Sequence, residues 1–454
     1  MLKLKFVEKK HKHMNVLFVS LGCDKNLVDT EVMLGLLAQK GYQMVNCEEE
    51  ADIIVVNTCC FIHDAKEESI QTILEMAEYK KEGSLKALIV TGCLAQRYKQ
   101  EILDEIEEVD AVLGTTSYDK IVAAIDSALQ GKKTLELQDI DRLPNVNTKR
   151  LVTTGGHFAY LKIAEGCDKH CTYCVIPKIR GNFRSVPMEK LIKEAEELVN
   201  QGVKELILVA QETTLYGKDL YGKKSLHVLL KELCKIPRLR WIRVLYCYPE
   251  EITDELIQVM KEEDKICNYL DLPIQHASDA VLKRMGRRTN QAQLIEIIDK
   301  LREEIPDIVL RTTLITGFPG ETQDQHEELM GFIDEMEFDR LGVFTYSPEE
   351  DTPAAIMKDQ IDESVKEDRQ AELMELQQEI AFEKAENMIG RDLLVMIEGK
   401  VADENVYVGR TYMDAPNVDG LIFVETGIEL MSGDFVNVTI TGALEYDLIG
   451  EIKE

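Results

Sequence analysis

Residues 166–174 read Gly-Cys-Asp-Lys-His-Cys-Thr-Tyr-Cys, directly after a predicted strand at 157–164. This stretch has three cysteines at C-x3-C-x2-C spacing, namely Cys167, Cys171 and Cys174. Thiolates are soft ligands, and cysteines this close together are able to hold one metal centre. Three cysteines would leave one iron of a four-iron cluster open to a substrate. The alternative is a zinc site that adds His170, although zinc ligands usually come as two separated pairs.

Strand and helix patterns alternate through the region around this stretch, 150–360. Six strands are expected, at 157–164, 205–210, 241–247, 269–273, 309–315 and 341–346. Helical patterns lie between them, for example at 187–201 and 291–304. A complete barrel of this type has eight such units, so six units predict a partial (β/α)6 TIM-like barrel. Its active site should lie at the carboxyl ends of the strands, where the cysteine loop lies.

Strand and helix patterns also alternate in the N-terminal region, 14–135, which is shorter. Apolar strand patterns occur at 15–22, 52–57, 86–91 and 111–114. Helical patterns follow them at 26–40, 65–80, 98–107 and 118–129. Strands that alternate with helices in this way predict an α/β domain with a doubly wound parallel sheet.

Three further cysteines each come just after one of these strands. Cys23, Cys59 and Cys93 are separated by 36 and 34 residues, about one strand–helix unit each. Because parallel strands end at one edge of a sheet, these cysteines are expected to meet there. The alternative is three unrelated buried cysteines, since free cysteine is often buried. Cys60 competes with Cys59, but neighbouring strand-end residues point in opposite directions, so one of them should face the edge.

The C-terminal region changes to short alternating strands after a charged segment at 361–388, which predicts a solvated helix that connects domains. Five strands are expected between 389 and 454, at 393–399, 406–412, 421–425, 435–442 and 448–452. They predict a small antiparallel barrel of the oligonucleotide-binding type. Such barrels often bind RNA, but residues 391–454 contain four basic and thirteen acidic residues, a net charge of −9. A phosphate-binding face, and thus direct nucleic-acid binding, is not expected.

Composition narrows the class of protein further. The chain has 454 residues and a net charge of −30, which favours a basic partner over a nucleic acid. No apolar run approaches 18 residues, so no membrane span is expected. Met1–His13 has five lysines but no apolar run of a signal peptide, which indicates a disordered tail, and translation could begin at Met14. Eleven cysteines without an export signal indicate a reducing cytoplasm.

The cysteine motifs together resemble the radical S-adenosylmethionine methylthiotransferases, over about 14–454. The motifs are Ser20-Leu-Gly-Cys-Asp-Lys-Asn26, Asn57-Thr-Cys59, Thr91-Gly-Cys93, and the stretch from Glu165 to Arg180-Gly181. The resemblance implies that Cys23, Cys59 and Cys93 hold an auxiliary 4Fe-4S cluster. It assigns Cys167, Cys171 and Cys174 to the 4Fe-4S cluster that cleaves S-adenosylmethionine, and it makes the terminal barrel a TRAM domain.

Two branches of this family differ in their motifs. The tRNA branch, MiaB-like, usually has Tyr-Gly-Cys-Gln-Met-Asn where this chain has Leu-Gly-Cys-Asp-Lys-Asn at 21–26. Residues 409–416, Gly-Arg-Thr-Tyr-Met-Asp-Ala-Pro, look like the RimO branch. That branch implies methylthiolation of the β-carbon of an aspartate in small-subunit ribosomal protein S-twelve. The alternatives are a tRNA adenosine methylthiotransferase and a non-catalytic iron–sulfur carrier. Cys60 and Asn417 depart from the usual pattern, and Asn417 is assigned no function.

The implied reaction uses S-adenosylmethionine twice, as methyl donor and as radical source, with an external electron donor. No general base is needed to remove hydrogen from carbon. Four residues of the loop and strand ends are expected to contact S-adenosylmethionine, namely Tyr173, Glu212, Gln275 and Thr313. Glu212 would pair with its amino group; the alternative is a solvated loop acid. His276, a lone histidine, is more often structural than catalytic.

Overall fold

The computed structural model describes residues 14–144, 146 and 149–453. The tail predicted at Met1–His13 lies outside the described residues. The chain forms two compact units. The first extends to Thr153 and also includes Val175–Asn182, whereas the second contains 154–174 and the chain from Phe183 onward. Among the described helices, none is long and apolar enough to cross a membrane.

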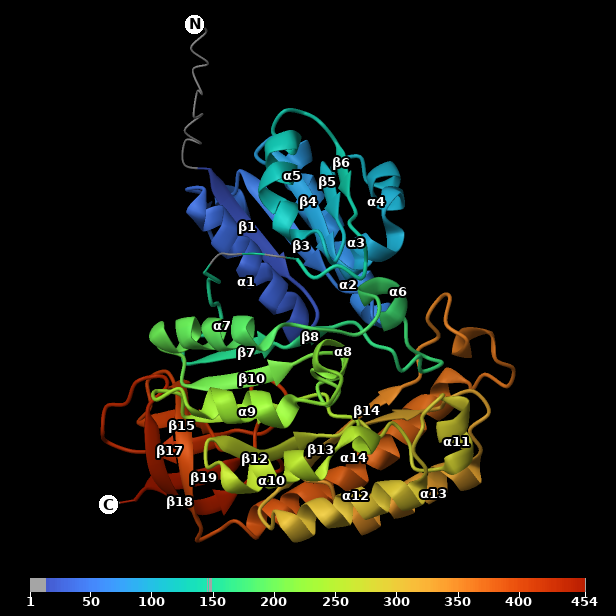
Figure 1. The fold of residues 1–454 in the computed structure, drawn as a ribbon, viewed down its shortest axis with the longest axis vertical. Helices are drawn as coiled ribbons and strands as arrows, with labels where there is room; N and C mark the ends of the chain where they lie inside the picture. Colours follow the sequence, from blue (N-terminus) through green and yellow to red (C-terminus); the bar gives the residue numbers. More distant parts are fainter. Residues whose placement is uncertain (1–13, 145, 147–148, 454) are drawn as a thin grey trace, which may run out of the picture. The chain divides into compact units, whose positions relative to one another are not determined.

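The first unit has the predicted parallel, doubly wound sheet, shown in blue to teal in Figure 1. Its strands are β1 (Asn15–Ser20), β2 (Gln43–Met44), β3 (Ile53–Thr58), β4 (Ala87–Gly92), β5 (Ala111–Leu113) and β6 (Thr134–Glu136). Their order is β2-β1-β3-β4-β5-β6, and each neighbouring pair is parallel. β3 and β4 are buried throughout, because apolar side chains cover both faces of the sheet.

The helices of this unit are α1 (Asp24–Gln39), η1 (Glu48–Glu50), α2 (His63–Lys81), α3 (Cys93–Tyr98), α4 (Gln100–Glu105), η2 (Tyr118–Lys120), α5 (Ile121–Ala128) and α6 (Ile176–Arg180). The single helix predicted at 98–107 is wrong. Lys99 has a φ of 50°, which no helical residue adopts, so the chain forms two short helices on either side of it.

The second unit contains the predicted six-stranded parallel sheet. Its strands are β7 (Phe158–Lys162), β10 (Glu205–Val209), β11 (Trp241–Val244), β12 (Ile266–Asp271), β13 (Val309–Thr316) and β14 (Arg340–Thr345). The sheet runs β14-β13-β12-β11-β10-β7 and stays open. A short hairpin, β8 (Ala164–Glu165) and β9 (Arg184–Ser185), follows β7. The helices are α7 (Met188–Asn200), α8 (Lys218–Tyr221), α9 (Leu226–Cys234), η3 (Pro249–Glu251), α10 (Asp254–Glu262), α11 (Asp279–Arg284), α12 (Gln291–Glu304), α13 (Gln323–Met336), η4 (Ala354–Ile356) and α14 (Glu363–Glu386).

Helix α14 covers β14, the edge strand of this sheet. Lys366 Nζ donates to the Tyr346 carbonyl (2.9 Å) and Gln370 Nε2 to the Val343 carbonyl (2.7 Å). An uncovered strand edge would leave backbone groups free to pair with another chain. The helix was expected to be a solvated connection, but part of its polar surface is buried against the sheet.

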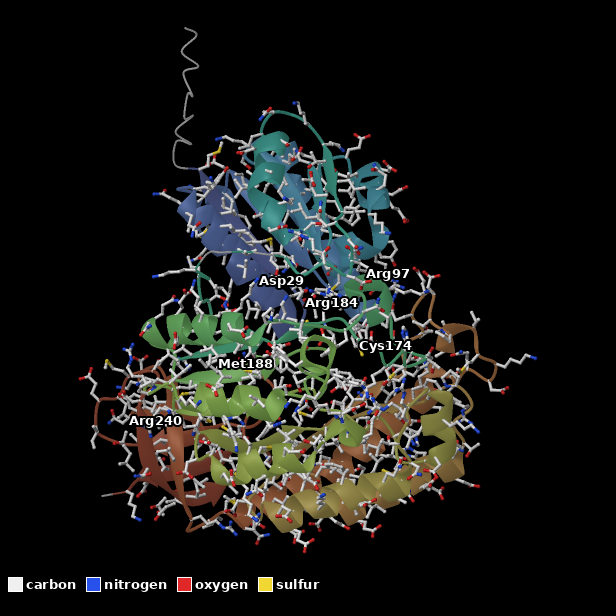
Figure 2. All side chains as sticks on the ribbon, viewed as in Figure 1. Asp29, Arg97, Cys174, Arg184, Met188 and Arg240 are labelled. Carbon is white, nitrogen blue, oxygen red and sulfur yellow. The ribbon has the colours of Figure 1, made fainter. Side chains whose placement is uncertain are left out.

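The five C-terminal strands close into the predicted small barrel. They are β15 (Asp392–Lys400), β16 (Val406–Arg410), β17 (Ile422–Glu425), β18 (Phe435–Ala443) and β19 (Leu448–Ile452), in the order β15-β16-β17-β19-β18. The barrel packs at the amino ends of the core strands (Figure 1). There the Trp241 and Phe435 rings form a T-shaped pair, with centroids 4.8 Å apart. Arg240, labelled in Figure 2, lies over the same phenyl ring.

A buried carboxylate joins the barrel to the core. Glu205, the first residue of β10, accepts hydrogen bonds from Arg243 Nε (2.9 Å) and Arg410 Nη2 (2.7 Å). Arg410 also donates to Glu398 (2.6 Å). Glu205 and Arg243 are fully buried and Arg410 is 1% exposed. Burial works to raise the pKa of Glu205, but the charges of Arg410 and Arg243 hold it below its usual value.

Two acids of the small barrel also form buried ion pairs with arginines of the core. Asp414 pairs with Arg340 Nη2 (2.5 Å), at the start of β14. Asp419 lies 3.3 Å from Arg311 Nε and accepts a hydrogen bond from the Tyr269 hydroxyl (2.6 Å). Both carboxylates are almost fully buried, with side chains 3% and 2% exposed. They stabilise the fold and are not available to a partner.

Glu205→Gln should destabilise the second unit strongly, by roughly 3–5 kcal/mol, because it removes the buried carboxylate that pairs with Arg243 and leaves Arg410 with Glu398 alone. The matched control is Glu262→Gln, which removes a half-exposed carboxylate 3.5 Å from Lys231. That control should leave the denaturation midpoint almost unchanged, because exposed ion pairs contribute little to stability. Chemical denaturation followed by circular dichroism measures both, and equal losses would contradict the role given to Glu205.

Candidate active site

The loop with Cys167, Cys171 and Cys174 lies at the carboxyl edge of the sheet of the second unit, after β7 and β8. Thr172 anchors it, since its amide donates to the Met285 carbonyl (2.9 Å) and its hydroxyl to the Arg284 carbonyl (2.8 Å). Cys167 and Cys171 are 6% and 5% exposed, and Cys174 is partly exposed. Burial raises the pKa of the Cys167 thiol to about 12, with a contribution from the nearby Glu212 carboxylate. Binding to iron would therefore have to displace protons from buried thiols.

An aromatic ring next to this loop contacts two cations, one from the loop itself and one from outside it. Arg287 and Lys169 lie over the Tyr248 ring, at 4.3 and 4.8 Å from its centre. The Tyr248 hydroxyl is 3.8 Å from the Cys171 sulfur. Sequence reasoning missed Tyr248 and Arg287. The strand-end rule could have indicated Tyr248, which follows β11, but nothing in the sequence pairs it with Arg287.

Glu212, after β10, is fully buried, so the interpretation as a solvated loop acid is wrong. One carboxylate oxygen accepts hydrogen bonds from the Thr214 amide (3.0 Å) and from its hydroxyl. Lys169 Nζ lies 3.8 Å from the other oxygen, which accepts no hydrogen bond within the described residues. Burial raises the pKa of Glu212 to about 7, against the effects of Thr214 and Lys169. Its pairing with a ligand amine stays a prediction.

The remaining predicted contact residues lie at the same edge. The Gln275 amide donates to the Thr313 carbonyl (2.9 Å), and Gln275 has a φ of 73°, a strained backbone of the kind found at functional sites. The Tyr173 ring meets Phe318 edge-on, with centroids 6.5 Å apart. His276 is fully buried, and burial lowers its pKa to about 3. A permanently neutral imidazole fits the structural interpretation of His276.

Buried polar atoms without a hydrogen-bond partner among the described residues follow several strands at this edge. They include Gln211 Oε1, Glu212 Oε2, Glu250 Oε2, Thr316 Oγ1 and Tyr346 Oη. Buried polar atoms normally have partners, so unpaired ones at one edge indicate a place for a polar ligand. S-adenosylmethionine, with an amine, a carboxylate and ribose hydroxyls, fits this set of donors and acceptors.

The first unit brings its three predicted cysteines to one edge. Cys23 precedes α1, Cys59 follows β3 and Cys93 begins α3 after β4. Gly22 packs so closely on Cys59 that a Cβ at Gly22 would lie 2.6 Å from the Cys59 Cβ. Burial raises the pKa of the Cys59 and Cys93 thiols, and the nearby Cys23 thiol adds to both shifts. The three cysteines therefore lie at one edge of the sheet, and a shared cluster held by them stays a prediction.

Cys60, the neighbour of Cys59, is fully buried in an apolar cluster that also contains Cys93, Ile73 and Val90. It is near enough to Cys93 to contribute to the raised pKa of the Cys93 thiol. Cys59 lies against Gly22. Cys59 as the ligand at this strand end stays a prediction.

A single-ion site is absent from the described part of the chain, where no three His, Cys, Asp or Glu side chains converge enough to hold one metal ion. A four-iron cluster has a different requirement, because each cysteine binds a different iron. The thiolates therefore surround a volume rather than meet at one point. Two sets of three thiols at two sheet edges fit that requirement by the chemistry of their donors.

Comparisons with known proteins agree with this organisation. Residues 15–114 match the Uncharacterized protein family UPF0004, residues 161–333 the Radical SAM superfamily and residues 389–452 the TRAM domain. The ribosomal protein uS12 methylthiotransferase RimO of Lachnoclostridium phytofermentans is 69% identical over 437 residues, covering 96% of this chain and 99% of that protein. The enzyme of the same name from Clostridioides difficile is 52% identical and covers 95% and 97%. The chain belongs to the RimO family. It is a radical S-adenosylmethionine methylthiotransferase.

Solved structures support the fold alone. The radical S-adenosylmethionine methyltransferase TsrM from Kitasatospora setae superposes with a TM-score of 0.54 at 13% identity, covering 76% of this chain and 77% of that one. The cobalamin-dependent radical enzyme OxsB gives a TM-score of 0.51 at 14% identity, covering 71% and 52%.

Gly22→Ala should reduce iron binding after anaerobic reconstitution by up to about half, since the added Cβ would push Cys59 out of place. The matched control is Gly41→Ala. Gly41 has the same kind of backbone, φ +85° against +83°, but no atom within 4 Å of an added Cβ. Both variants carry a similar backbone strain of about 1 kcal/mol, so only the clash differs. Equal iron content in the two variants would contradict the close packing at Gly22.

Proposed function

We propose that this enzyme methylthiolates the β-carbon of an aspartate in ribosomal protein uS12, the S-twelve protein of the small subunit. S-adenosylmethionine serves both as methyl donor and as radical source. The observation that carries the proposal is the pair of three-cysteine sets in a chain 69% identical to a uS12 methylthiotransferase. An external donor supplies the electron, and the reaction takes place in the cytoplasm, where the ribosomal protein is made.

Each cysteine set holds its own 4Fe-4S cluster in this proposal. Cys167, Cys171 and Cys174 hold the radical cluster, and Cys23, Cys59 and Cys93 hold the auxiliary cluster. When bound, the first would supply the electron that cleaves S-adenosylmethionine, and the second would hold the sulfide that S-adenosylmethionine methylates. Three thiolates in each set leave one iron open for a ligand that is not protein.

The residues of the chain bind and orient the reactants. Glu212 pairs with the amino group of S-adenosylmethionine through the oxygen that accepts no hydrogen bond from the described residues, while Thr214 holds the other oxygen of Glu212. Gln275, which follows β12, and Thr313, on β13, contact the same molecule, and Tyr173 covers it from the cysteine loop. Lys169 is held by Glu250 (3.2 Å) and Glu251 (2.5 Å), which fixes the loop against η3. Positioning of this kind lets the cofactors supply the chemistry.

The charge of the small barrel supports a protein substrate over tRNA. Its outward acids include Asp403, Glu404, Glu425, Glu429 and Glu451, all exposed. Ribosomal proteins are generally basic because they pack against RNA phosphates, and such a surface attracts them and repels tRNA. A tRNA adenosine remains the second candidate substrate only through the shared family fold.

Two clusters should be measurable as iron. Replacing Cys167, Cys171 and Cys174 with alanine should remove about half the iron of reconstituted protein, as should replacing Cys23, Cys59 and Cys93. The second variant should still cleave S-adenosylmethionine to 5′-deoxyadenosine but form no methylthiolated product. Cys60→Ala is the matched control and should retain all the iron. Full iron content in either triple variant would overturn the two-cluster assignment.

The substrate is decided by offering uS12 and unmodified tRNA to the same reduced enzyme with S-adenosylmethionine. Mass spectrometry of uS12 peptides should show one aspartate heavier by a methylthio group in place of hydrogen. Nucleoside analysis of the tRNA should show no methylthiolated adenosine. The opposite pattern would establish the tRNA reaction. The control is the Cys167, Cys171 and Cys174 triple variant, which should modify neither.

A further inference from the structure

Three polar side chains are buried next to the cysteine edge of the first unit. Asn26 and Asp29 lie on α1, where Figure 2 marks Asp29, and Arg180 ends α6. Asn26 is fully buried, Arg180 is 1% exposed and Asp29 is 4% exposed. Burying charged groups is costly unless they are paired and hydrogen-bonded, so this cluster needs a physical explanation.

Asn26 connects the three cysteine segments. Its amide nitrogen donates to the carbonyls of Leu21 (3.1 Å) and Thr58 (2.9 Å). Leu21 lies two residues before Cys23, and Thr58 lies directly before Cys59. The amide oxygen of Asn26 is 3.8 Å from the Cys93 sulfur. One buried side chain therefore contacts all three segments.

Arg180 holds Asn26 in this position. One guanidinium nitrogen donates to the Asn26 amide oxygen, and another donates to Asp29 (2.9 Å). Cysteine loses its proton when it binds iron, so the Cys93 thiol would no longer be a donor to Asn26. The Arg180 donor would remain. Burial raises the pKa of the Cys59 and Cys93 thiols, and the Arg180 charge opposes both shifts.

We propose that Asn26 and Arg180 are positioning residues for the auxiliary cluster. Asn26 ties the three cysteine segments together, and Arg180 both fixes Asn26 and offsets the negative charge of a thiolate-bound cluster. This inference rests on the proposed two-cluster function. Reduction adds one negative charge to a cluster, so the Arg180 cation stabilises the reduced form, whereas the Asp29 carboxylate disfavours it.

The test uses the full-length Cys167, Cys171 and Cys174 to alanine variant, which should hold the auxiliary cluster alone. Its midpoint potential is measured by titration with dithionite, followed by electron paramagnetic resonance. Arg180→Gln should lower the ratio of reduced to oxidised cluster at a fixed potential by about tenfold, a shift of about 59 mV for one electron. Arg180→Lys, which keeps the charge, should restore most of this, and Asp29→Asn should shift the potential in the opposite direction.

Arg150→Gln is the matched control. Arg150 is 5% exposed and also pairs with a carboxylate of α1, with its Nε 2.9 Å from Glu31. Its loss should destabilise the first unit without moving the potential. A general structural effect of removing a buried arginine would instead appear in both variants.

The outcomes separate this inference from the function on which it rests. A parent variant without iron would overturn the two-cluster proposal and the inference with it. In an iron-loaded parent, an unchanged potential in both Arg180→Gln and Asp29→Asn would overturn the inference alone. If Arg180→Gln fails to assemble the cluster, Asp29→Asn decides: a raised potential supports the role of Arg180, and an unchanged one overturns it.

Discussion

Strand direction is the constraint on which both candidate sites depend. Each neighbouring pair in the two six-stranded sheets is parallel, so the strands of a sheet all end at one edge. Parallel sheets have their ligand sites at that edge. Cys23, Cys59 and Cys93 are far apart in the sequence, and this geometry alone brings them together. The same rule places Glu212, Tyr248 and Gln275 around the second cysteine loop.

The amino ends of the core strands stabilise the fold and do not form a candidate site. There, buried carboxylates and guanidinium groups join the core to the small barrel, with Glu205 between Arg243 and Arg410 at the centre. In barrels of this kind, the amino-terminal face contributes stability while the carboxyl-terminal face carries the chemistry. The small barrel is therefore a fixed part of the second unit, held by charges that are costly to separate.

Sequence patterns predicted the strands well where local signals are strong. Short continuous apolar runs between turn residues, such as those of β3 and β4, are typical of buried strands. β2 and β6 were missed because they are short, two and three residues, and gain their pairing from neighbours that no local pattern reveals. The break at Lys99 was missed for a similar reason, since a lysine carries no turn signal.

The residues of the candidate sites also divide into those that a sequence pattern predicts and those that no pattern reveals. The cysteines could be predicted because spacing along the chain and strand direction together determine where they meet. The pairing of Arg287 with Tyr248 and of Arg180 with Asn26 could not, because the partners are 39 and 154 residues apart. Such pairs form only after the backbone has folded, and their residue types are common on any protein surface.

A count of acidic and basic residues does not give the charge that the small barrel presents to solvent. A net charge of −9 treats all thirteen acids alike. Asp414 and Asp419 are neutralised inside the second unit by Arg340 and Arg311, so part of that charge never reaches solvent. The exposed acids that remain act through water and salt, which screen them beyond about 8 Å. In the proposed function they should therefore guide the encounter with a basic protein substrate more than they add to its final affinity.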